Sequence, residues 1–143
     1  MNFGLIGAGC ALGIAAIGSA IGIGIAGSSA IGAWKRCYVN NKPAPFILTV
    51  FAGAPLTQTI YGYLVMMFMN NSVSETTKGW YGLGLGIAAG LAMCFSAIAQ
   101  GKAGAAGSDA FAETGKGFSQ YITVVGLCET VALFVMVFCL ISV

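Results

Sequence analysis

The sequence predicts an all-α membrane protein with four transmembrane helices, arranged as two repeated antiparallel hairpins. Three observations lead to this fold class. Only 7% of the 143 residues are charged, against about 25% in an ordinary soluble domain. The charges leave four long apolar stretches, and each supplies the roughly 20 residues that a membrane helix needs. The second half of the chain repeats the first at an offset of 77 residues.

The four spans are expected near residues 4–33, 45–69, 79–107 and 119–142. Polar turns separate them. Residues 34–43 carry three basic side chains and no acid, residues 70–79 carry one of each, and residues 109–117 form the third turn. The chain therefore divides into a first hairpin, residues 1–73, and a second hairpin, residues 74–143.

The charges of the turns predict the orientation in the membrane. Loops rich in Lys and Arg stay in the cytoplasm, so the turn between spans 1 and 2 is expected there. The turn between spans 3 and 4 then faces the cytoplasm as well, and both termini lie outside. The expected location is the cell membrane, with lipid around a multi-pass protein.

Composition also excludes several functions. The chain has no His, which rules out His-based catalysis and His metal sites. Five Cys residues in so apolar a chain do not indicate a disulfide scaffold, and they are interpreted as reduced packing residues. A net charge of +2 is too small to indicate a nucleic-acid partner.

Small residues form a stripe along the first span and a matching stripe along the third. Such stripes let helix backbones approach closely, which drives helix association in lipid. Two assemblies fit: a tight four-helix monomer, or a ring in which spans 1 and 3 of many copies form an inner circle. The two long stripes favour the ring. Their members are Gly9, Gly13, Ala16, Ala20, Gly24 and Gly27, and Gly86, Gly90, Met93, Ala97, Gly101 and Gly104.

Glu129 is the most informative single residue, because it lies halfway along the fourth span. A charge at mid-membrane costs about 2.5–3.5 kcal/mol on insertion scales, so acids at this depth are generally functional. The structural alternative is a protonated Glu that makes a hydrogen bond between helices.

Candidate partners of this carboxyl lie on the second and third spans. Ala54, Thr57, Gln58 and Tyr61 have the spacing of one helix face. Pro55 removes a backbone donor and leaves a nearby carbonyl free. Gln100 and Glu129 lie at nearly equal distances from the turn at Thr114-Gly115, which predicts the same depth.

Four or five oxygens can therefore converge, from Thr57, Gln58, Gln100, Glu129 and the carbonyl of Ala54. Hard cations take oxygen ligands, and one carboxylate among neutral oxygens balances a single positive charge. The set favours Na⁺, with H⁺ as the alternative, and Tyr61 is placed to hydrogen-bond the carboxylate. The competing interpretation of this polar face is ordinary interhelical hydrogen bonding.

Three motifs resemble those of a known family: Leu56–Gly62, Ser96–Lys102 and Glu129-Thr130. They are similar to the proteolipid of rotary V-type ATPases, in particular the K subunit (the c-subunit equivalent) of bacterial sodium-transporting enzymes. The resemblance implies a rotor ring of identical subunits, each carrying one ion on Glu129. It also implies Thr57, Gln58, Gln100 and the Ala54 carbonyl as ligands, and Tyr61 as the residue that locks the carboxylate.

The same resemblance implies the partners and the division of labour. The subunit is not an enzyme by itself, since ATP hydrolysis takes place on other subunits. A basic residue of a stator subunit releases the ion, and the central stalk docks at the cytoplasmic turns. The sodium type of the family has Leu before the proline and Gly after it, where this chain has Ala54 and Leu56; the Thr57-Gln58 pair favours Na⁺. Rival functions are a proton-carrying rotor and a small four-helix multidrug exporter.

Overall fold

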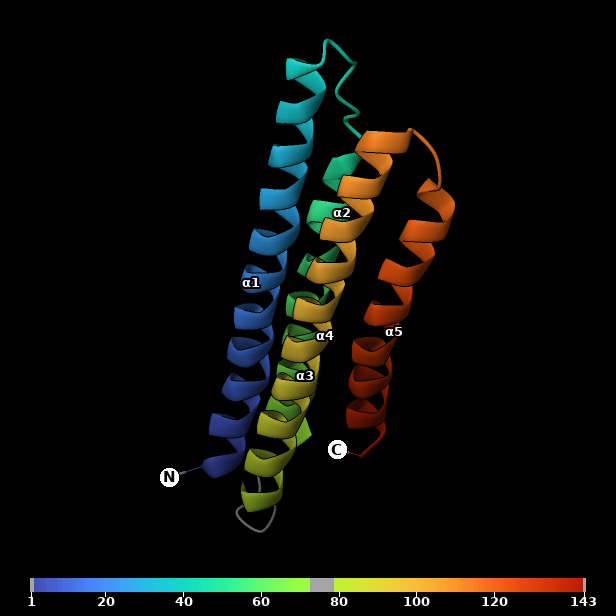
Figure 1. Ribbon diagram of the computed structural model, residues 1–143. Coiled ribbons are helices and arrows are strands. Elements are labelled where there is room, and N and C mark those ends of the chain that lie inside the picture. Colours follow the sequence, from blue (N-terminus) through green and yellow to red (C-terminus); the bar gives the residue numbers. More distant parts are fainter. Residues whose placement is uncertain (1, 73–78, 143) are drawn as a thin grey trace.

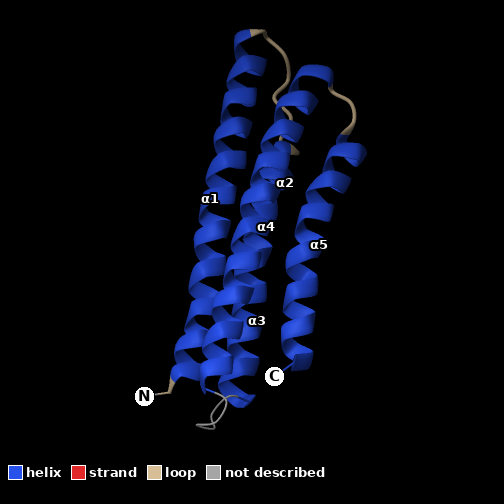
Figure 2. Cartoon of the chain, turned by 60° about the horizontal axis from the view of Figure 1, so that its bottom comes forward, coloured by secondary structure: helices blue, strands red, loops and turns tan. Residues whose placement is uncertain are grey.

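A computed structural model describes residues 2–72 and 79–142, and these residues form a bundle of long helices (Figure 1). Three helices are long and apolar enough to cross a membrane: α1 (Phe3–Val39), α4 (Gly79–Thr114) and α5 (Phe118–Ser142). Figure 2 shows only helices and connecting loops in the described part of the chain. The expected all-α class is therefore confirmed.

The second expected span is present as a broken helix. It consists of α2 (Leu48–Gly53), the 3₁₀ helix η1 (Ala54–Leu56) and α3 (Thr57–Ser72), and at 16 residues α3 is too short to count as a span alone. The break falls at Pro55, which has no N–H to give to the carbonyl of Phe51. The chain tightens there, and the N–H of Thr57 bonds to the Ala54 carbonyl.

Two of the predicted turns are shorter than expected, and the sequence expectation is corrected here. Residues 34–39 continue α1, so the first turn begins only at Asn40. Residues 109–114 likewise continue α4, and the chain reverses at Gly115 and Gly117, whose φ angles are +66° and +87°. Charged side chains do not end a helix; left-handed backbone does, and glycine adopts it without strain. Most of the predicted turn at 70–79, with the hairpin boundary at 73/74, lies outside the described residues.

Helices α1 and α4 run parallel, side by side, and make the most extensive contact in the molecule (Figure 1). Glycine permits the close approach near one end of this seam and at its middle. A Cβ at Gly7 would lie 2.6 Å from the Cα of Leu83, and one at Gly101 would lie 2.5 Å from the Cα of Gly22. Helix α3 packs against both members of this pair, whereas α5 packs against α4 and α3.

The helices fall into two lengths. Helix α1 has 37 residues and α4 has 36; at 1.5 Å per residue each is about 55 Å long. Helix α5 has 25 residues and is about 37 Å long. The broken element from Leu48 to Ser72 matches α5 rather than the longer pair.

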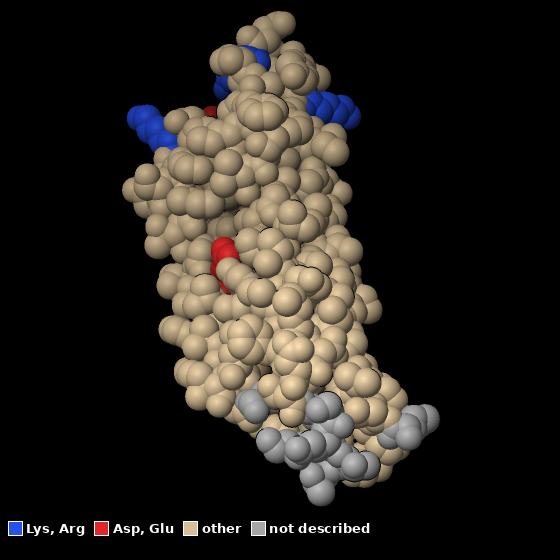
Figure 3. All heavy atoms as spheres, turned by 180° about the vertical axis from the view of Figure 1, so that it is seen from behind, with Lys and Arg blue, Asp and Glu red and all other residues tan. Residues whose placement is uncertain are grey.

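Lys and Arg side chains gather at one end of the molecule, and an acidic side chain lies alone near mid-height (Figure 3). The basic end holds the turns after α1 and α4. There the Arg36 guanidinium, from α1, forms an ion pair with Asp109 of α4. The pair is exposed, so it contributes little to stability.

Candidate functional site

The Glu129 carboxylate joins three elements of the bundle. The Tyr61 hydroxyl, from α3, donates to its Oε1 at 2.7 Å. The amide of Gln100, from α4, donates to its Oε2 at 3.2 Å. Within the described residues no Lys or Arg forms an ion pair with it. The carboxylate is thus held by neutral donors in an apolar bundle, which leaves its negative charge uncompensated inside the chain.

A chain of fully buried amides leads away from the carboxylate. Gln58 and Gln100 are both 0% exposed. Gln58 Nε2 donates to Gln100 Oε1 at 2.8 Å, and Gln100 Nε2 also reaches the Val125 carbonyl at 3.2 Å. Helix α3 places Gln58 one turn before Tyr61 on the same face, so that Gln58 reaches Gln100 of α4 and Tyr61 reaches Glu129 of α5. Two glutamine amides so deep in the bundle are rigidly oriented by these bonds.

The carbonyl of Ala54, which directly precedes Pro55 at the helix break, lies next to this chain of amides. Thr57 Oγ1 donates to the Ala54 carbonyl at 3.2 Å and lies 3.3 Å from Gln58 Oε1. The oxygens of Ala54, Thr57 and Gln58 thus form one cluster at the start of α3. The 3₁₀ turn is what brings the Ala54 carbonyl beside the Thr57 hydroxyl.

All six residues singled out in the sequence occur in one connected hydrogen-bond network: Ala54, Thr57, Gln58, Tyr61, Gln100 and Glu129. The predicted equal depth of Gln100 and Glu129 is confirmed by their contact. Leu56 is 53% exposed and does not join the network.

Ser96 belongs to the network although sequence reasoning used it only as a marker of the repeat. Its hydroxyl donates to the Cys128 carbonyl at 2.6 Å and accepts from Gln58 Nε2 at 3.4 Å. The signal was available: Ser96 precedes Gln100 by four residues, so the two share a face of α4. It ties α4 to α5 beside the carboxylate.

The site brings a single carboxylate together with neutral oxygens. It offers one carboxylate and several neutral oxygens, and the described residues contain no group of three or more His, Cys, Asp or Glu side chains that could hold a metal ion. A single bound positive charge would neutralise Glu129, whereas a divalent ion would leave an excess charge.

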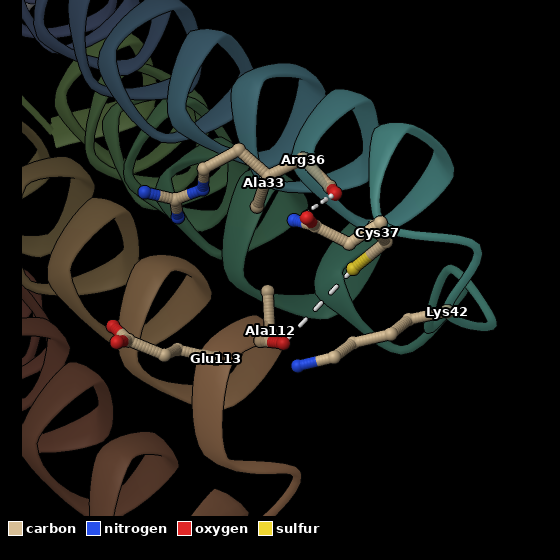
Figure 4. A pocket seen from close by; sticks show the side chains of 7 residues that line it. Ala33, Arg36, Cys37, Lys42, Ala112 and Glu113 are labelled. Atoms are coloured by element: carbon tan, nitrogen blue, oxygen red, sulfur yellow. Dashed lines mark hydrogen bonds between the residues drawn. The ribbon is translucent and has the colours of Figure 1, made fainter.

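Apart from this network, a hollow lies at the basic end, between α1 and α4, and has a volume of about 250 Å³. Figure 4 shows Arg36, Lys42 and Glu113 around it, with the Cys37 thiol directed at the Ala112 carbonyl at 4.0 Å. Its lining carries both positively and negatively charged side chains. The described residues that line it do not form a combination typical of a catalytic site.

Comparison with known proteins agrees with the expected resemblance at a coarser level. Residues 83–142, which include most of α4 and all of α5, match the family model of the ATP synthase C-subunit. The chain is also 41% identical over 132 residues to the A-type ATP synthase subunit K of Methanocaldococcus jannaschii. That alignment covers 92% of this chain and 57% of the relative, so the chain spans somewhat more than half the relative's length. The hairpin that carries Gln100 and Glu129 thus has the sequence pattern of that family model.

Proposed function

We propose that this chain is a ring-forming proteolipid, of the c or K type, of a rotary ATP synthase or ATPase. In this role it carries one monovalent cation on Glu129, and Na⁺ is favoured over H⁺. The observation that carries the proposal is the mid-helix carboxylate of Glu129, held by Tyr61 and Gln100 beside a cluster of neutral oxygens. The match of residues 83–142 to the C-subunit model and the likeness to a subunit K support the same class.

Neutralisation of Glu129 is the central step of the mechanism. With a cation bound by Glu129, Thr57, Gln58, Gln100 and the Ala54 carbonyl, the site has no net charge and can face lipid as the ring turns. Tyr61 holds the carboxylate in place meanwhile. At the stator, a basic residue of another subunit competes for the carboxylate and releases the ion. Each ion that crosses exchanges about 2.3 kcal/mol per 100 mV, which the ring transmits as torque.

The remaining parts of the machine lie on other chains. ATP hydrolysis or synthesis takes place on separate subunits, so this subunit is not catalytic alone. The last turns of α1, with Lys35 and Arg36, and the turns after α1 and α4, with Lys42 and Lys116, face the cytoplasm and dock the central stalk. The complex resides in the cell membrane.

Protection of Glu129 from a carbodiimide tests the ion. Carbodiimides react with a protonated carboxyl in an apolar site, so bound Na⁺ should slow the labelling at fixed pH. In the assembled complex, we expect labelling of Glu129 to fall as Na⁺ rises while the same concentration of K⁺ or choline has less effect. Labelling that responds to pH but not to Na⁺ would identify a proton carrier instead.

Glu129→Gln is the variant that tests whether the carboxylate itself binds the ion. This variant keeps the size and the hydrogen-bonding ability of the side chain but cannot balance a cation. It should assemble, fail to bind ²²Na⁺ and lose ion-coupled ATPase activity. Full sodium binding by Glu129→Gln would remove the proposed site, and retained transport by a dimer of the chain would favour the exporter.

A further inference from the structure

Ser96 carries a buried hydroxyl at the point where α3, α4 and α5 meet. The residue is 6% exposed. Its hydroxyl donates to the Cys128 carbonyl of α5 at 2.6 Å and accepts from Nε2 of Gln58, on α3, at 3.4 Å. A serine hydroxyl carries a single proton, and a carbonyl oxygen can only accept. The proton of Ser96 is therefore committed to α5, and only a lone pair of its oxygen faces Gln58.

This lone pair decides which branch of the Gln58 amide can face α4. A glutamine amide carries both N–H donors on one branch and its acceptor oxygen on the other. An oxygen branch turned toward Ser96 would place two acceptors together in a position that is 0% exposed. Gln58 therefore presents its nitrogen to Ser96, and its Oε1 lies on the other side, 3.3 Å from the Thr57 hydroxyl.

Every N–H of the two buried amides has an acceptor of its own. Those of Gln58 go to Ser96 and, at 2.8 Å, to Gln100 Oε1. Those of Gln100 go to the Val125 carbonyl and to Glu129 Oε2, each at 3.2 Å. The donors of both amides are thus fully used, and neither amide can reverse without breaking two hydrogen bonds.

We propose that Ser96 is a positioning residue of the cation site, which keeps the Gln58 amide turned so that its oxygen is presented to the ion. The inference rests on the proposed function and adds to it a residue that acts through Gln58. The Ser96 oxygen is engaged by its own two contacts. A reversed Gln58 amide would direct N–H groups at the cation in place of the oxygen ligand that a hard cation takes.

Removal of the hydroxyl has a specific structural consequence. Ser96→Ala leaves one N–H of Gln58 without an acceptor, close to a Cys128 carbonyl that has lost its serine donor. A buried donor without an acceptor is costly, so the amide should turn this N–H toward the Cys128 carbonyl. That rotation draws Gln58 Oε1 away from Thr57 and from the oxygen cluster that Thr57 forms with the Ala54 carbonyl.

The carboxylate itself should not be affected by this rotation. Its two hydrogen bonds come from Tyr61 and Gln100, and neither involves Ser96. Binding of a metal cation uses the Gln58 oxygen, whereas protonation of Glu129 does not. Loss of the Ser96 hydroxyl should therefore weaken the binding of Na⁺ while leaving the binding of H⁺ unchanged.

Carbodiimide labelling of Glu129 in membranes that contain the assembled complex measures both ions. Labelling is followed over a Na⁺ titration at fixed pH, and over a pH titration without Na⁺. Ser96→Ala should raise the Na⁺ concentration that gives half-protection roughly tenfold, the factor expected for one lost buried hydrogen bond, with the pH midpoint unchanged. Ser96→Cys, which keeps the size but is a weak donor and acceptor, should shift the sodium titration in the same direction, and it decides the matter if the alanine variant does not assemble.

Ser96→Thr and Ser29→Ala are the matched controls. Ser96→Thr keeps the hydroxyl, and its added methyl group can enter the apolar groove that Ser96 lines between α4 and α5, so it should restore the native sodium titration. Ser29 donates to the Ala105 carbonyl at 2.8 Å, a bond of the same kind between α1 and α4. Ser29→Ala should leave the sodium titration unchanged; a rise equal to that of Ser96→Ala would assign the effect to a general loosening of the bundle and overturn the inference.

The two titrations also separate the inference from its alternatives. A shifted pH midpoint in Ser96→Ala would overturn it, because Ser96 would then act on Glu129 through the neighbouring Cys128 carbonyl. Native sodium protection in Ser96→Ala would refute the positioning role and leave the proposed ion carrier intact. Labelling of the native chain that ignores Na⁺ would instead refute sodium as the carried ion, and the orientation of a sodium ligand with it.

Discussion

Adding one methyl group at Gly7 should loosen the seam between α1 and α4. A Cβ at this position would lie 2.6 Å from the Cα of Leu83 and 2.7 Å from the carbonyl carbon of Gly82. Ordinary contact begins near 3.4 Å, so the helices must separate by about 0.8 Å at this end, since backbone atoms cannot rotate away. A gap of that size forfeits a quarter to a half of the dispersion attraction of the atoms that lose contact.

The size of the effect follows from two opposed contributions. Overpacking of this kind costs about 1–3 kcal/mol, and the upper half of that range applies because the obstacle is backbone. Replacing Gly by Ala within a helix returns up to about 1 kcal/mol. The net loss for Gly7→Ala is therefore about 1–2 kcal/mol, a roughly tenfold fall in the ratio of folded to unfolded chain.

Unfolding of the purified full chain by SDS in mixed micelles measures this change. The Trp80 ring stacks on Phe3 at 4.4 Å, at the same end of the seam, so its fluorescence reports the local separation. Gly126→Ala is the matched control, because a Cβ there meets nothing within 4 Å, and its midpoint should stay or rise. An unchanged midpoint for Gly7→Ala would refute the close backbone contact on which the reasoning rests.

Two further substitutions probe the network around Glu129. Tyr61→Phe removes the 2.7 Å hydrogen bond to Glu129 and keeps the ring in place, so the assembled complex should still bind ²²Na⁺ but lose it several-fold faster on dilution; the native release rate would show that Tyr61 does not lock the carboxylate. Ser96→Ala removes the bond to the Cys128 carbonyl and should lower the SDS unfolding stability by about 0.6 kcal/mol, the average for such bonds in a membrane bundle, and by no more than about 1.7 kcal/mol, the maximum. Equal loss in Ala97→Ser, placed beside it on α4, would mean that volume rather than the hydrogen bond decides.

The helices themselves were predictable from the sequence, but two of their ends were not. The apolar stretches predicted the starts of α1 and α4 and both ends of α5 to within a few residues. They did not predict where α1 and α4 end. The charges at Lys35, Arg36 and Asp109 were interpreted as turns, whereas these side chains project from continuous helices and two of them pair across the seam. Polarity marks where a helix leaves lipid, and only the backbone at Asn40 and Gly115 marks where it stops.

The candidate site was largely predictable because helix periodicity fixes which side chains share a face. Spacing alone placed Thr57, Gln58 and Tyr61 together, and the hairpin placed Gln100 opposite Glu129. Ser96 was not predicted as a member of the site, although its spacing of four residues from Gln100 places both on one face of α4. The direction of the Gln58 amide, which gives its N–H to Gln100 and turns its oxygen toward Thr57, depends on three-dimensional contacts that no spacing encodes.

The unequal lengths of the helices have a consequence for the surrounding bilayer. The hydrocarbon core of a membrane is about 30 Å thick, a thickness that suits α5 at about 37 Å with modest tilt but not α1 and α4 at about 55 Å. In the ring that we propose, with α1 and α4 on the inside, the enclosed lipid meets a different apolar height from the lipid outside. Since each ångström of mismatch carries a cost, the enclosed patch must be thickened or shifted along the axis relative to the outer membrane, which resists any sliding of the circle out of its plane.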